Sequence, residues 1–68
     1  MNMYRPHARD AAASWRAIRA HNAGLIDLTP GALEAVHLVA VAYDINADVS
    51  STIIARARTA IAIDRARP

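Results

Sequence analysis

Residues 29–43 read TPGALEAVHLVAVAY, and this stretch decides the fold. The hydroxyl of Thr29 can accept a hydrogen bond from the first turn of a helix, and Pro30 follows at the first helical position, where its missing N–H is not needed. Glu34 then lies near the positive end of the helix dipole, which favours a carboxylate. We therefore predict a helix over residues 30–43.

This central helix is apolar on almost every side. Apolar side chains occupy two sides of its helical wheel: Leu33, Val36, Val39, Ala40 and Tyr43 on one, and Ala35, Leu38, Val41 and Ala42 on the other. Only a narrow strip of Glu34, His37 and Asp44 is polar. A helix with this pattern must be buried on most of its surface, and two neighbouring helices can barely cover it.

The chain before this helix predicts a first helix over residues 6–23. Pro6 is acceptable in a first helical turn, and apolar residues recur at helical spacing through Trp15 and Ile18. Gly24 follows where a helix end favours a left-handed residue. Trp15 is the only Trp and aligns with Ile18, so we interpret it as a core anchor.

The chain after the central helix breaks at residues 44–48 and then predicts a third helix over residues 49–66. The break has turn chemistry, and Asn46 or Asp48 can cap the helix that follows. Residues 59–64 also alternate with period two and contain β-branched Ile, which favours a strand. Because Ala and Arg dominate the flanks, helix is the preferred prediction there.

The fold class that follows is all-α, a single domain of three helices completed by homodimerisation. Seventeen of the 68 residues are Ala, so the core has little side-chain volume, and with no Cys the chain has no disulfide to stabilise it. We expect self-association through the central and third helices, most simply as a twofold dimer. The residues predicted to form this contact are Leu38, Val41, Ala42, Ile54 and Ile61. The alternative is a compact monomer with extra Ala methyls at its surface.

The composition gives less information about the cellular compartment than about the fold. The longest apolar run, residues 35–43, is interrupted by His37 and is far shorter than the ~20 residues of a membrane span. No signal peptide is apparent, and the absence of Cys fits a reducing compartment. We therefore expect a cytoplasmic protein, and the Ala- and Arg-rich composition is compatible with a phage- or plasmid-encoded chain.

No constellation of residues predicts catalysis, a metal or a cofactor. The three His, at positions 7, 21 and 37, are spaced by 14 and 16 residues, so they form no pair on one helix face, and no Cys supports them. The Ser and Thr residues do not stand beside a His and an acid, and two glycines cannot form a phosphate-binding loop. We predict a non-enzymatic protein without a cofactor or a small-molecule substrate.

Two kinds of binding function remain, and the first is a regulatory or inhibitory protein-binding module acting as a homo-oligomer. The second is a dimeric regulator of double-stranded DNA, because residues 39–58 weakly resemble a helix-turn-helix. In that resemblance the start of the third helix would face the bases, through Ser51, Thr52, Arg56 and Arg58. The tight turn lacks its usual Gly, however, and the connection is about three residues longer than the standard turn.

Arginine supplies every basic side chain of the chain, which carries a net charge of +2. The four arginines Arg5, Arg9, Arg16 and Arg19 lie together on one face of the first helix. Of these, Arg5, Arg9 and Arg16 are predicted to contact an anionic partner or a nucleic-acid backbone. On the third helix, Arg58 and Arg65 share one flank and Arg56 lies on the other. The alternative is that these charged faces are exposed to solvent and bind nothing. A net charge of +2 permits a nucleic-acid partner without requiring one.

Overall fold

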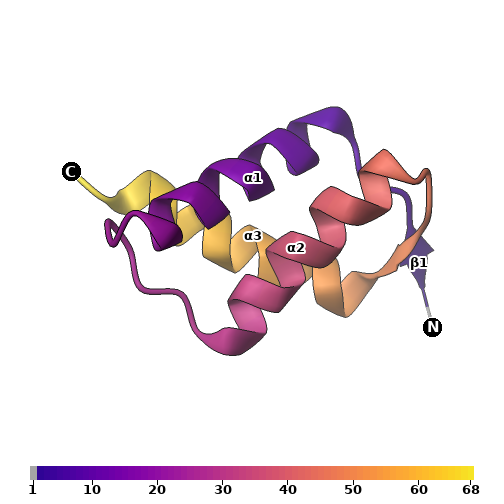
Figure 1. The fold of residues 1–68 in the computed structure, drawn as a ribbon. Helices are drawn as coiled ribbons and strands as arrows, with labels where there is room; N and C mark the ends of the chain where they lie inside the picture. Colours follow the sequence, from indigo (N-terminus) through magenta and orange to yellow (C-terminus); the bar gives the residue numbers. More distant parts are fainter. Residues whose placement is uncertain (1) are drawn as a thin grey trace.

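The computed structural model describes residues 2–68 and has three helices and one very small sheet (Figure 1). In chain order the elements are β1 (Met3–Tyr4), α1 (Ala8–Asn22), α2 (Pro30–Asp44), β2 (Val49–Ser50) and α3 (Ser51–Ala66). α1 and α3 run in the same general direction, and α2 runs opposite to both. The predicted three-helix architecture is confirmed, and residues 59–64 are helical. No helix within residues 2–68 combines the length and apolar character needed to cross a membrane.

The ends of α1 and α2 follow the signals in the sequence. The Thr29 hydroxyl accepts a hydrogen bond from the backbone N–H of Ala32 at 3.2 Å, and Pro30 is the first residue of α2. Gly24 has φ +74°, one residue beyond the C-cap of α1. Glycine adopts this left-handed conformation without steric cost, so the chain can turn sharply out of α1.

Two helices begin two residues later than predicted, because extended backbone precedes each of them. α1 begins at Ala8 rather than at Pro6, and the backbone N–H of His7 donates to the Asp10 carboxylate at 3.3 Å. α3 begins at Ser51, because Val49 belongs to β2 and the hydroxyl of Ser50 caps the helix by accepting from the N–H of Ile53 at 3.3 Å.

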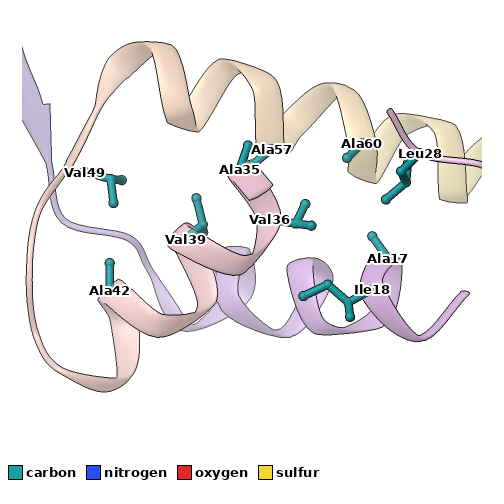
Figure 2. Packing of buried hydrophobic residues seen from close by; sticks show 10 residues of the cluster. All are labelled: Ala17, Ile18, Leu28, Ala35, Val36, Val39, Ala42, Val49, Ala57 and Ala60. Carbon is teal, nitrogen blue, oxygen red and sulfur yellow. The ribbon is translucent and has the colours of Figure 1, made fainter. Parts of the chain in front are cut away.

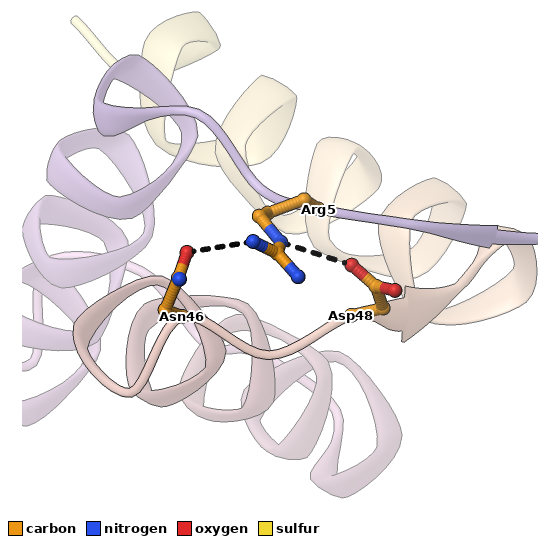
Figure 3. Close-up of polar contacts among 3 residues, drawn as sticks. All are labelled: Arg5, Asn46 and Asp48. Carbon is orange, nitrogen blue, oxygen red and sulfur yellow. Dashed lines mark hydrogen bonds and ion pairs between the residues drawn. The ribbon is translucent and has the colours of Figure 1, made fainter.

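The residues predicted to cap α3 instead hold the N-terminal segment in place. β1 pairs with β2 in antiparallel register, with Met3 opposite Ser50 and Tyr4 opposite Val49. Beside this sheet the guanidinium of Arg5 donates to Asn46 Oδ1 at 3.0 Å and pairs with Asp48 Oδ1 at 3.2 Å (Figure 3). Arg5 therefore belongs to this loop contact and not to the charged face of α1.

The core lies where α2 packs against both of its neighbours (Figure 2). Its larger members are Val36 and Val39 of α2, Ile18 of α1 and Leu28 of the connecting loop, and Trp15 packs against them from the side. Most other members are Ala, and small side chains let helices approach closely. The rings of Trp15 and His37 form a T-shaped contact, with an interplanar angle of 89° and centroids 6.2 Å apart. Trp15 thus anchors α1 against α2, as predicted.

One buried carboxylate ties the end of α3 to α1. Asp64 is 2% exposed. Its carboxylate oxygens form ion pairs with the Nε atom of Arg16 in α1 at 2.9 Å and with the Nε atom of Arg67 in the C-terminal segment at 2.7 Å. The hydrogen bond from Arg67, together with the positive charges of Arg16 and Arg67, lowers the pKa of the Asp64 carboxyl below its ordinary value, although burial alone would raise it. Asp64 is therefore ionised in the folded protein and links three segments.

A second buried polar group has no such partner. The side chain of Ser14 in α1 is fully buried, and its hydroxyl makes no hydrogen bond. A buried hydroxyl without a partner loses its hydrogen bonds to water and gains nothing in exchange.

We predict that Ser14→Ala stabilises the protein. The substitution removes the unpaired hydroxyl and keeps the small volume, so the free energy of unfolding should rise by about 1 kcal/mol and the melting temperature by about 5 °C. Thermal denaturation followed by circular dichroism measures the change. Ser51→Ala, at an exposed serine, is the matched control and should leave the melting temperature nearly unchanged. A lower melting temperature for Ser14→Ala would show that the hydroxyl is satisfied.

We predict that Asp64 makes stability fall in acid. Because its pKa is lowered on folding, its contribution is complete above the unfolded-state pKa of about 3.9 and is lost as the pH falls through the lower folded-state value. Asp64→Asn should cost about 2 kcal/mol at pH 7 and should flatten the decline of stability below about pH 4. Urea denaturation at several pH values tests this, with the exposed Asp27→Asn as control. Parallel pH profiles for both variants would contradict the assignment.

Candidate functional site

The solvent face of α2 carries a row of apolar side chains. Leu38 is 41% exposed, Val41 is 45% exposed and Ile45 is 68% exposed, and their spacing of three and four residues aligns them along the helix. We call these three residues the α2 stripe. Single exposed apolar residues are normal on any protein, but an aligned row of large ones is typical of a contact surface.

The predicted self-association residues therefore divide into two groups. Leu38 and Val41 lie exposed on the α2 stripe, whereas Ala42 is buried in the core of the subunit and points toward Val49 (Figure 2). Ile61 is only 8% exposed and Ile54 is half-buried, both on the side of α3 that faces α1. Ile45 was missed because it follows the predicted end of the helix, although its spacing from Val41 could have indicated it.

α1 and α3 are separated along their outer side by a continuous groove. Two hollows, of about 420 and 680 Å³, follow one another between the helices and share Asp10 and Arg58 in their walls. Tyr4, Ser51 and Ile54 line the end near β1, and Ile61, Ala62 and Arg65 line the far end. We call these joined hollows the α1–α3 groove. Both Ile54 and Ile61 belong to its wall, so their apolar surface faces this groove and not the α2 stripe.

The structure separates the predicted arginines into three environments. Arg9 and Arg58 lie on the α1–α3 groove together with Arg65, and none of these three makes an ion pair within residues 2–68. Arg56 lies on the opposite flank of α3, in a hollow with Thr29 and Thr59. The flank assignment made from the sequence is confirmed: Arg58 and Arg65 lie together, and Arg56 lies apart.

Arg16 has a structural role that the sequence did not reveal. Its guanidinium is bound to the buried carboxylate of Asp64, so it is committed to the contact between α1 and α3. A residue 48 positions away supplies that carboxylate, and helical periodicity carries no information about such a pair. Arg9 and Arg16, which share a face of α1, therefore differ in what they can offer to a partner.

The start of α3 is open to solvent. Ser51 and Thr52 are both exposed, and Ser51 lies on the wall of the groove beside Tyr4. The backbone N–H of Ser51 donates to the carbonyl of Asn2 at 3.1 Å, so the N-terminal segment passes directly beside this helix end. Asp48, whose charge would repel a phosphate, is paired with Arg5.

Within residues 2–68 no three His, Asp or Glu side chains come together in a way that could hold a metal ion. The Nδ1 atom of His21 accepts a hydrogen bond from the backbone N–H of Leu28 at 3.2 Å, which ties the loop after α1 to that helix. His37 packs against Trp15. These two His thus have packing or hydrogen-bonding roles.

Comparisons with known proteins found no match to this chain. No protein-family model matches the chain, and neither a curated protein nor a solved structure matches it. The two surfaces defined above are therefore interpreted from their own chemistry.

We predict that Arg16 and Arg9 differ in their effect on stability. Arg16→Ala should lower the free energy of unfolding by about 1 kcal/mol, because it removes one partner of a buried carboxylate while Arg67 remains. Arg9→Ala should change it by less than about 0.5 kcal/mol, as expected of an unpaired surface residue. Urea denaturation of both variants at neutral pH measures the difference. Equal losses in the free energy of unfolding for the two variants would contradict the structural role of Arg16.

Proposed function

We propose that the protein is a small non-enzymatic module that binds other proteins and acts as a homodimer. The observation that carries this proposal is the α2 stripe, in which three large apolar side chains stand at helical spacing on the solvent face. A chain with an Ala-rich core has little stability to spare, and covering Leu38, Val41 and Ile45 with a second copy would add buried apolar surface.

The register of α2 favours an antiparallel twofold pairing. A twofold axis placed at Val41 brings that residue against its own copy, and it brings Leu38 of one subunit near Ile45 of the other. On the flank of the same contact, His37 of one subunit would lie near Asp44 of the other. Each contact between Leu38 and Ile45 would then have a polar pair beside it. The surface is thus self-complementary, as an isologous interface requires.

A regulatory or inhibitory role is the function that suits this arrangement. The α2 stripe is on the solvent face of α2, whereas the α1–α3 groove opens on the outer side of the other two helices. A dimer formed through α2 therefore leaves the groove free for a different protein. Binding to a regulated protein needs no catalytic group.

The alternative is a dimeric DNA-binding regulator that uses the start of α3. The exposure of Ser51 and Thr52 favours it, since small polar residues in that position can reach base edges. The placement of the arginines argues against it, because Arg56 and Arg58 lie on opposite flanks of α3 and do not form one basic face. Protein binding therefore remains the preferred function.

We predict that Val41→Glu converts a dimer into a monomer. Two carboxylates would be buried against one another at the axis, so the dimer dissociation constant should rise at least about tenfold. Sedimentation equilibrium of the natural and the variant protein over micromolar concentrations measures this. Leu25→Glu is the matched control, because Leu25 is exposed in the loop after α1 and lies outside the stripe. A natural protein that stays monomeric up to about 1 mM would end the dimer proposal.

A salt titration separates the two candidate functions. Duplex DNA bound through Z phosphates should dissociate with a log–log slope of about −0.9Z, and Arg56→Ala or Arg58→Ala should reduce that slope. We expect instead no specific binding to duplex DNA, even at low salt, in an electrophoretic mobility shift assay. Tight duplex binding that either substitution weakens would favour the DNA-binding alternative.

A further inference from the structure

The α1–α3 groove extends along most of α3. Its walls run from Ser51 at the start of that helix to Ala66 at its end. At 1.5 Å per residue this is a length of about 24 Å, which accommodates roughly four turns of a bound helix. α1 and α3 contact each other less than either contacts α2, and this is why the space between them stays open.

The wall of the groove is apolar at several points along its length. Tyr4 and Ile54 supply exposed apolar surface at one end, and the methyls of Ala62 and Ala13 supply it at the other, where Ile61 is 8% exposed. An occupant with only polar groups would leave this surface uncovered. An amphipathic helix can present apolar side chains along the length of the groove.

The charged groups of the groove are mostly positive. Arg9, Arg58 and Arg65 come from both helices and have no ion-pair partner within the described chain, and Arg5 at the end is already paired with Asp48. The acidic side chain on the wall is Asp10, whose carboxylate accepts the backbone N–H of His7. The groove thus keeps an excess of positive charge from three unpaired arginines.

We propose that this groove binds an acidic amphipathic helix of another protein, an inference that rests on the proposed protein-binding function and names its partner chemistry. Such a helix would place apolar residues at i, i+3 or i+4, and i+7 against Tyr4, Ile54 and Ala62, in the manner of helix-in-groove recognition. Glu or Asp on its flanks would pair with the arginine forks, which match carboxylate geometry in a bidentate way.

A nucleic acid satisfies this groove less well. The phosphates of a duplex would meet the arginines, but they would leave the exposed apolar surface of Tyr4 and Ile54 uncovered. An acidic helix covers the apolar wall and neutralises the arginines at the same time. It therefore accounts for both features of the groove.

The test is a selection from a display library of random 16-residue peptides. The immobilised protein is the Leu38→Glu variant, which removes self-association from the measurement and whose fold is checked by circular dichroism. We expect the enriched peptides to carry net negative charge and apolar residues at helical spacing. Fluorescence anisotropy then measures their affinity for the protein and for its variants, and a 20-base-pair duplex is titrated in parallel.

The matched variants decide where the peptides bind. Arg58→Glu should weaken the enriched peptides at least tenfold, and the double variant Arg9→Ala with Arg65→Ala should weaken them several-fold. Arg19→Glu and Arg56→Glu make the same charge reversal as Arg58→Glu but outside the groove, and they should have little effect. Amide shifts in NMR spectra should gather on α1 and α3.

Several results would overturn the proposal. They are a selection that enriches no peptide, enriched peptides without acidic residues, affinities that Arg58→Glu leaves unchanged, or a duplex that binds more tightly than any peptide. None of these depends on the dimer, whose own test is sedimentation of the natural protein. Failure of the groove and failure of self-association are therefore distinguishable.

Discussion

The structure depends on the packing of α2 against both other helices with very small side chains. Alanines fill most of the contacts around Val36 and Val39, so the three helices approach closely but enclose little volume. α1 and α3 each contact α2 more than they contact each other. The α1–α3 groove lies where that contact is smallest, and the α2 stripe lies on the face of α2 that neither helix covers.

Polar contacts, not apolar volume, fix the two ends of the pair formed by α1 and α3. Near the C-terminus, Asp64 holds Arg16 and Arg67 in a buried ion-pair network. Near the N-terminus, the β1–β2 pairing and the contacts of Arg5 attach the segment before α1 to the loop before α3. Buried ion pairs do not always stabilise a fold, but they select one arrangement when each charge is matched.

The sequence predicted the features that depend on neighbours in the chain. The helix ends at Thr29, Pro30 and Gly24 agree with the prediction, because caps and left-handed turns depend on nearby residues. The helix over residues 59–64 also agrees with the prediction, which was made from the Ala and Arg residues that flank the alternating segment. The features that the sequence did not predict join segments that lie far apart in the chain. Two-residue strands have no periodicity to detect, and nothing near Arg16 indicates that a carboxylate 48 residues away will bind it. The same limit explains why Ala42 and Ile61 were expected at a surface: a wheel shows which residues share a face, but not which face a neighbour covers.

The position of the two candidate surfaces has a consequence for how they could act together. In a three-helix arrangement the solvent face of α2 points away from the side on which α1 and α3 meet. A dimer formed through the α2 stripe would therefore carry two α1–α3 grooves on its outer sides, both accessible at once. A partner with two acidic helices, or two copies of one partner, could then engage both grooves, and the second contact would form at a raised effective concentration. Such bivalence would raise the overall affinity above that of one groove with three unpaired arginines, so the proposed dimer would strengthen binding at the proposed groove site.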